Sequence, residues 1–359
     1  AVHNLPPTAR SYRLDWIGNN GALSNISSTA SIIKKDGPLV APFTWAEKIY
    51  SDNLGSHTAR IALENCKDIA LSTDGSLLAL VSKDKNSLGL FSYRGPGSLI
   101  PLSSFSSSKD PRFQGPVRLQ FIPNTHTLLV LCETTGTLFS FHIDETTYQL
   151  SLFESLQSDL LIGAYALALL TPQWSLISNP TKDRVYVVNI SNLQNSQILE
   201  WASPSISGLE RFSKPTCMAI NTSNNEVAIG TLGDDSIYIF SFSSETGLGT
   251  YTYKLPKELF STLASLSDPV DMAFTNDGTH LFVLSYYGKA LIQLDKDIQS
   301  GSYTPVSAIK SGTNNIQGFN YPQRFVIVPN SNFILITANG TGDGISIIQF
   351  GTLHTLQWL

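Results

Sequence analysis

The chain has 359 residues, a formal net charge of −5 and a hydrophobic content of 42%, enough to build a folded core. Charged residues make up only 14%, against roughly 25% in typical globular proteins. With no basic stripe in the sequence, nucleic-acid binding is disfavoured. No apolar run approaches the ~20 residues that a membrane-spanning helix needs.

A repeat of about fifty residues organises the sequence. Six segments align with one another, at 67–75, 117–124, 165–171, 216–221, 270–278 and 323–330. Their equivalent positions are 48 to 54 residues apart and are occupied by Asp68, Arg118, Ala166, Cys217, Asp271 and Arg324. A period of roughly 40–50 residues is typical of propeller blades.

Each repeat contains short apolar runs separated by polar turns. The first run is followed by a turn such as 73–75 or 276–278, where Asp-Gly favours a hairpin because both residues accept positive φ. A second run follows, for example 77–81 or 281–284, and then a third run with alternating polarity, for example 88–93 or 237–240. A weaker fourth run ends the unit. Runs of this length and alternation predict a four-stranded antiparallel sheet.

The sequence therefore predicts an all-β protein: a seven-bladed β-propeller formed by residues 1–359 as a single domain. Six repeats are clear from about residue 66, and residues 1–65 leave room for one degenerate blade; six blades are the alternative. Either the run 10–17 or the C-terminal run 352–359 supplies the strand that closes the ring. The best helical segment, 256–266, is expected to form only a short turn of helix.

The low charge and the many Ser, Thr and Asn residues favour a secreted protein or one in the lumen of the secretory pathway. Glycosylation sequons begin at Asn25, Asn189, Asn221 and Asn339. The three cysteines, Cys66, Cys132 and Cys217, form no Cys-x-x-Cys motif, and we expect buried thiols without a disulfide.

The first strands of a propeller line its central channel, and the funnel at the channel entrance is the default ligand site. Arg118 and Arg324 are expected to bind a carboxylate or enolate there, and Asp271 or Asp68 to act as acid or base. Further candidates for ligand binding are Lys67, Tyr165, Tyr321 and Gln323. The structural alternative is an Asp–Arg network that only neutralises the channel mouth. We predict no metal and no cofactor, and the oligomeric state stays open.

The blade pattern over residues 66–350 resembles the lactonase-type seven-bladed propellers, which include bacterial 6-phosphogluconolactonases and fungal 3-carboxymuconate lactonizing enzymes. The matching features are the turns at 72–75 and 275–278 and the third strands with Gly-containing turns at 90–99 and 239–248. The resemblance implies lactone chemistry in the funnel. The six histidines of this chain fall outside the strand starts where active members often carry one, so no histidine acid is carried over.

Three hypotheses for function follow. The first is a lactonase- or cycloisomerase-like enzyme acting on a small molecule in the channel, with a biosynthetic cyclase as a variant. The second is a propeller without chemistry that binds a protein or glycan partner. The third is a structural or cell-surface propeller.

Overall fold

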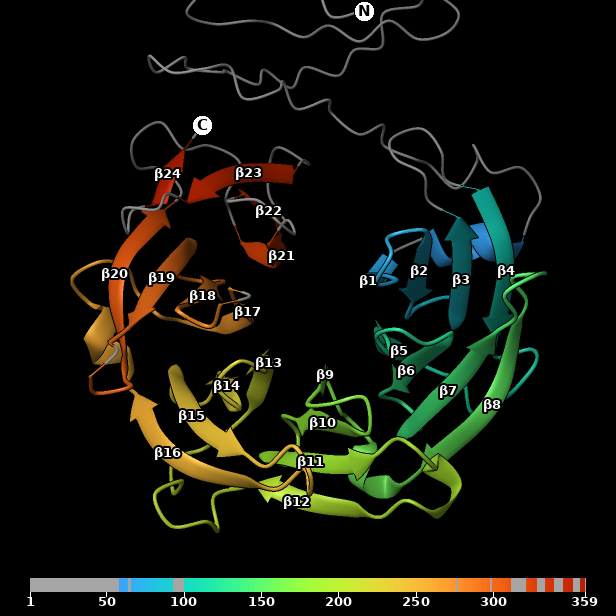
Figure 1. Cartoon of the computed structure of the whole chain (residues 1–359), viewed down its shortest axis with the longest axis horizontal. Coiled ribbons are helices and arrows are strands. Elements are labelled where there is room, and N and C mark those ends of the chain that lie inside the picture. The colour runs from blue at the N-terminus through green and yellow to red at the C-terminus, as the bar shows by residue number, and fades with distance from the viewer. Residues whose placement is uncertain are drawn as a thin grey trace, which may run out of the picture.

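The computed structural model describes residues 58–63, 66–92, 100–275, 277–297, 299–310, 321–327, 333–338, 345–350 and 356–358. These residues form six four-stranded antiparallel sheets, numbered here as blades 1 to 6. Each blade is a meander in which sequential strands pair. The predicted β-propeller with four-stranded blades is therefore confirmed, and the blades surround a central channel (Figure 1).

The strands follow the predicted runs closely. Blade 1 contains β1 (Cys66–Leu71), β2 (Leu77–Ser82), β3 (Ser87–Ser92) and β4 (Ile100–Ser106). Blade 2 contains β5 (Pro116–Phe121), β6 (Thr127–Cys132), β7 (Thr137–Ile143) and β8 (Leu150–Gln157). Blade 3 contains β9 (Ala166–Leu169), β10 (Trp174–Asn179), β11 (Arg184–Asn189) and β12 (Ile198–Ala202).

The second half of the ring repeats this plan. Blade 4 contains β13 (Pro215–Asn221), β14 (Glu226–Thr231), β15 (Ser236–Phe242) and β16 (Gly249–Leu255). Blade 5 contains β17 (Pro269–Phe274), β18 (His280–Ser285), β19 (Ala290–Lys296) and β20 (Tyr303–Lys310). Blade 6 contains β21 (Pro322–Ile327), β22 (Phe333–Ala338), β23 (Ile345–Phe350) and β24 (Leu356–Trp358).

Closure of blade 6 is settled by β24, which comes from the C-terminal run and pairs with β23. The other closing segment considered from the sequence, 10–17, and almost all of the predicted degenerate blade 1–65 lie outside the described residues. In Figure 1 the arc between β21 and β1 contains no described strand. The seventh blade and the single-domain boundary therefore stay predictions.

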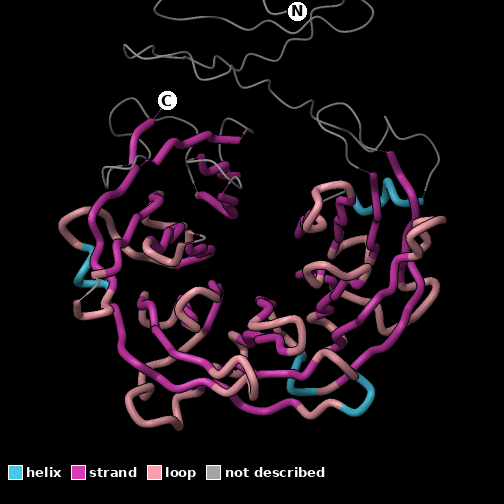
Figure 2. Tube along the Cα trace, viewed as in Figure 1, coloured by secondary structure: helices cyan, strands magenta, loops and turns pink. Residues whose placement is uncertain are grey.

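Helix is confined to short 3₁₀ turns in the described part of the chain (Figure 2). They are η2 (Thr58–Leu63), η3 (Asp159–Leu161), η4 (Leu193–Asn195) and η5 (Lys257–Phe260). The last lies within the segment where the sequence predicts a short helical turn. None of the described helices has the length and apolar character needed to cross a membrane.

The hydrophobic core is divided into layers between successive blades. One buried cluster, for example, joins Leu88 and Leu90 of blade 1 to Phe139 and Phe141 of blade 2, and Phe113 packs between them. Similar clusters join blades 2 to 3, 3 to 4, 4 to 5 and 5 to 6. Because burying a Leu or Phe side chain contributes about 1.5–3 kcal/mol, these layers fix the position of each inner strand around the channel.

The predicted turns take the expected conformation. Gly75 follows Asp74 in the β1–β2 turn and has φ +73°, which glycine adopts without steric cost. The Ser72 hydroxyl donates a hydrogen bond to the Asp74 carboxylate, which also accepts from the Ser76 backbone N–H. These hydrogen bonds, the one from Ser72 first, lower the pKa of Asp74 to about 2. The sequence motif therefore builds a turn held by its own carboxylate.

Two predictions about modification can be examined in the structure. Cys132 and Cys217 are buried free thiols, whereas the Cys66 side chain lies outside the described residues. The Asn221 sequon is a correction: its amide is buried and donates hydrogen bonds to Glu226, Tyr303 and the Gly278 carbonyl. This asparagine is therefore closed to glycosylation in the folded protein. Asn25 and Asn339 lie outside the described residues.

Candidate functional site

The six equivalent positions found in the sequence occur at one register of the inner strands. In blades 1, 2, 4, 5 and 6 a β-bulge immediately precedes this position, at residues 67, 117, 216, 270 and 323. β9 of blade 3 begins directly at Ala166. A bulge bends its strand and redirects the neighbouring side chains. The repeated bulge therefore presents Asp68, Arg118, Cys217, Asp271 and Arg324 at one level of the channel.

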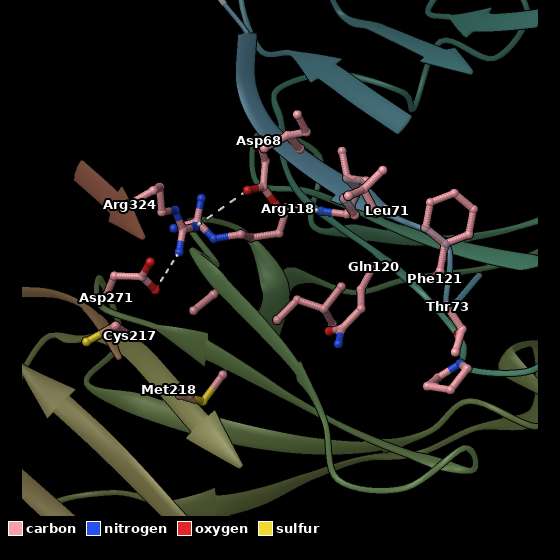
Figure 3. Close-up of a pocket in the computed structure, with 16 residues that line it drawn as sticks. Asp68, Leu71, Thr73, Arg118, Gln120, Phe121, Cys217, Met218, Asp271 and Arg324 are labelled. Atoms are coloured by element: carbon pink, nitrogen blue, oxygen red, sulfur yellow. Dashed lines mark hydrogen bonds and ion pairs between the residues drawn. The ribbon is translucent and has the colours of Figure 1, made fainter. Parts of the chain in front are cut away.

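These residues line a cavity of about 400 Å³ in the channel. The polar group consists of Asp68, Arg118, Asp271 and Arg324, together with Cys217 and Gln120. Residues further along the inner strands complete the wall: Ile69, Leu71, Leu119, Phe121, Leu167 and Met218. The side chains of Leu119 and Phe121 belong to the buried core between blades 1 and 2. Figure 3 shows the charged residues gathered at one end and Leu71, Phe121 and Thr73 at the other. The cavity therefore offers a charged end and a wall of mixed polarity, to which Thr73 and Gln120 also contribute.

Arg324 connects the two acids of this charged end. Its Nη1 lies 3.0 Å from Asp271 Oδ1, and its Nη2 lies 3.8 Å from Asp68 Oδ1 (Figure 3). Burial by itself would lower the pKa of Arg324, but the attraction of Asp271 and Asp68 outweighs it and the pKa is raised. Burial raises the pKa of Asp271, and the positive charge of Arg324 opposes this shift.

Each acid also fastens its blade to the next one. Asp68 Oδ2 accepts a hydrogen bond of 3.0 Å from the backbone N–H of Leu119 in blade 2. Asp271 Oδ2 accepts one of 2.9 Å from the backbone N–H of Phe325 in blade 6. Both partners directly follow a channel arginine, so the two contacts are equivalent in the repeat. Part of the role of these aspartates is therefore structural.

Arg118 is in a different position from Arg324. It is only 6% exposed, and its Nη1 donates a hydrogen bond of 2.8 Å to the Val117 carbonyl. Within the described part of the chain, no carboxylate lies within ion-pair distance of its guanidinium. Figure 3 shows its side chain directed toward Arg324. Burial and the repulsion of Arg324 both lower the pKa of Arg118. A buried guanidinium without an ion-pair partner costs free energy unless an anion compensates its charge.

Tyr165 and Lys67 lie beside Arg118. The Arg118 guanidinium is 4.7 Å and the Lys67 ammonium is 5.3 Å from the centre of the Tyr165 ring. Burial would raise the pKa of the Tyr165 phenol, but the attraction of Arg118, Lys67 and Arg324 outweighs it and the pKa is lowered. Three positive side chains from blades 1, 2 and 6 therefore act on one phenol from blade 3.

The remaining candidates are placed elsewhere. Tyr321 does not line the cavity; its ring packs 5.2 Å from that of Tyr286, with the Lys289 ammonium 4.6 Å away on its face. Tyr321 has φ +52° and precedes the channel position by three residues. The equivalent residues of four other blades also have positive φ: Gly115, Gly163, Lys214 and Asp268. This register is the turn that enters the inner strand. Gln323 occupies the bulge of β21, and its side chain is outside the described residues.

The sequence analysis missed the rest of the cavity wall and the bulges. A signal for the bulges was present, because a proline stands two residues before the channel position in four blades: Pro116, Pro215, Pro269 and Pro322. Cys217 lines the cavity as a free thiol that donates a hydrogen bond to the Pro269 carbonyl, and burial raises its pKa. Among the described residues no histidine lines the cavity, and no cluster of His, Cys, Asp and Glu suits a metal ion.

Comparison with known proteins shows the fold. No family model matches the sequence, and no curated protein matches it. Solved structures do match. The periplasmic gluconolactonase of Pseudomonas aeruginosa is 13% identical, with a TM-score of 0.62, covering 81% of this chain and 83% of that one. A Bacteroides uniformis protein assigned as a 6-phosphogluconolactonase is 16% identical, with a TM-score of 0.61 and coverage of 81% and 82%.

The structural resemblance to lactonase-type propellers predicted from the sequence is therefore confirmed. The same fold extends further, since the β-propeller domain of a Myceliophteria thermophila protein matches with 13% identity, a TM-score of 0.56 and coverage of 80% and 84%. At these identities the likeness establishes the architecture and leaves the activity to be argued from the site.

Proposed function

We propose that the channel binds a small molecule with an anionic or carbonyl-bearing head, and that the protein is a lactonase- or cycloisomerase-type enzyme. The observation that carries this proposal is Arg118, a buried guanidinium that faces Arg324 and has no carboxylate at ion-pair distance among the described residues. A ligand oxygen bearing negative charge would relieve the repulsion between the two arginines. The remainder of the molecule would lie against the wall of mixed polarity, which includes Ile69, Leu71 and Gln120.

The chemistry assigned to the site is stabilisation of a developing oxyanion. In lactone opening or closure, negative charge accumulates on the carbonyl oxygen, and charged donors placed in advance stabilise it more in the transition state than in the ground state. Arg118 and Arg324 supply these donors. Asp271 uses Oδ1 for Arg324 and for the backbone N–H of Met272, and Oδ2 for Phe325. We therefore assign Asp271 to the positioning of Arg324 and keep Asp68 as the carboxylate candidate for acid–base catalysis.

The lactonase assignment is supported by the propellers that share the fold, two of which carry gluconolactonase and 6-phosphogluconolactonase assignments. The first test measures hydrolysis of glucono-δ-lactone and 6-phosphogluconolactone through the acid that is released. The second measures the melting temperature of the protein in the presence of each lactone and of its carboxylate. Turnover that is lost in Arg118→Met and retained in Arg211→Met, an exposed arginine, supports the proposal.

Binding without turnover would favour the alternative of a non-catalytic binding propeller. Absence of both turnover and any ligand-induced rise in melting temperature, across lactones and carboxylates, would favour an Asp–Arg network with a purely structural role.

A further inference from the structure

Tyr165 lies where two like charges approach the same aromatic ring. Lys67 reaches it from blade 1 and Arg118 from blade 2, at 5.3 Å and 4.7 Å from the ring centre. Two cations on one neutral ring repel each other, and the quadrupole of a neutral phenol attracts each cation only weakly. A negatively charged phenolate would attract both. The arrangement is therefore better explained by an ionised ring than by a neutral one.

The surrounding charges point the same way. The cations acting on Tyr165 are Lys67, Arg118 and Arg324. The nearby acids, Asp68 and Asp271, both approach Arg324 and both accept a backbone N–H of the next blade. Cys217, which lines the cavity, stays a thiol because burial raises its pKa. Arg118 has no carboxylate at ion-pair distance within the described part of the chain. Asp68 and then Tyr165 are the groups whose negative charge attracts it most, and its guanidinium lies 4.7 Å from the centre of the Tyr165 ring.

We propose that Tyr165 is the proton-transferring group of this site: its phenolate is the counter-ion of Arg118, and it takes up a proton when an anionic ligand binds to the arginines. The second part rests on the proposed function, because it requires a ligand anion in the channel. A ligand carboxylate and the phenolate compete for the same positive charges. Binding of the carboxylate therefore favours protonation of the Tyr165 phenolate.

Tyr165 then takes the acid–base role of the proposed reaction in place of Asp68, whose Oδ2 accepts the backbone N–H of Leu119. In lactone hydrolysis the Tyr165 phenolate takes a proton from a water molecule, and the resulting hydroxide attacks the carbonyl carbon. The carbonyl oxygen becomes an oxyanion beside Arg118 and Arg324. When the ring C–O bond breaks, the leaving alkoxide takes the proton back from the Tyr165 hydroxyl. Lactone and water thus give a hydroxy acid, and Tyr165 returns to its starting state.

The experiment is a pH titration of the full chain labelled with ¹³C at the tyrosine Cζ, followed by NMR, in the wild type, Tyr165→Phe and Tyr148→Phe. Tyr148 is an exposed tyrosine and serves as the matched control. We expect one resonance to titrate well below the usual value of about 10, to be absent in Tyr165→Phe and to be present in Tyr148→Phe. In Arg118→Met it should move to higher pH, a result that does not depend on the Tyr165 variant folding.

The second arm uses gluconate as the ligand and measures its affinity by calorimetry from about pH 6 to about pH 10. Uptake of one proton on gluconate binding predicts that the affinity falls about tenfold per pH unit above the titration point of Tyr165. The slope should vanish in Tyr165→Phe. A Tyr165 resonance that titrates with the exposed tyrosines, or a wild-type slope of zero despite binding, would overturn the proposal. A low titration point without gluconate binding would support the phenolate and count against the proposed function alone.

Discussion

Arg324 donates a hydrogen bond of 3.0 Å from its Nη1 to Asp271 Oδ1, and this ion pair joins blades 5 and 6 at the channel. Arg118 occupies the same register of the repeat but has no carboxylate partner among the described residues. The difference separates the two arginines: Arg324 is paired with acids of the fold, and Arg118 is the one that we propose binds a ligand. The account of the site can be tested on this difference.

The two arginines should respond differently to removal. Arg324→Met leaves Asp271 and Asp68 without their guanidinium, and we expect the free energy of unfolding to fall by about 1–3 kcal/mol. Arg118→Met replaces a desolvated charge by an apolar side chain of similar length, and we expect a change within about 1 kcal/mol, or a gain. Urea unfolding of both variants measures this. Equal destabilisation by the two substitutions would show that Arg118 is held as firmly by the fold as Arg324.

Asp268 provides a pH test of the blade 4–blade 5 junction. Its pKa is raised by burial, with repulsion from Asp235 added. The ionised form is therefore disfavoured in the folded state, and stability falls as pH rises from below the unfolded value through the folded pKa. Asp268→Asn removes this charge, and asparagine also tolerates the φ of +54° at this position.

The variant should melt above the wild type at about pH 7, and the difference should close toward about pH 3, where both side chains are neutral. Asp159→Asn, at an exposed site, is the control and should show no such pH-dependent gain. An Asp268→Asn variant that is less stable at neutral pH would mean that the carboxylate has a favourable partner.

The layer between blades 1 and 2 should depend on Phe113. Its ring is fully buried and packs 5.3 Å from both Phe105 and Phe139. Phe113→Ala should cost about 3–5 kcal/mol, because it removes a buried ring and leaves a cavity. Phe153 on β8 is 63% exposed, and Phe153→Ala should change stability by less than about 0.5 kcal/mol. Thermal unfolding of the two variants measures this difference. Equal losses of stability in the two variants would contradict the layered core.

The blades and their register could be predicted from the sequence because the same signals recur in every unit. Apolar runs, Asp-Gly turns and a fixed spacing placed Asp68, Arg118, Asp271 and Arg324 at one level, and the structure gathers them around one cavity. The strand bounds followed from the same patterns, since each run is limited by polar turns that the chain cannot bury.

What the sequence could not supply was contact between blades. Asp271 accepts a hydrogen bond from Arg324, and Asp68 accepts one from the Leu119 backbone N–H. Both hydrogen bonds depend on side-chain directions that the bulges set. The approach of Lys67 to Tyr165 joins residues that belong to blades 1 and 3. The place of Tyr321 could not be predicted for a local reason: its positive φ places it in the entering turn, where it packs on Tyr286.

The most direct test of the account is the affinity of the channel for an anionic ligand, measured by calorimetry with gluconate for the wild type, Arg118→Met and Arg211→Met. Loss of a charge-assisted hydrogen bond of roughly 1.5–3 kcal/mol predicts binding that is about 10- to 100-fold weaker in Arg118→Met. Arg211→Met should bind as the wild type does. Equal affinity of Arg118→Met and the wild type would contradict an anion site at Arg118.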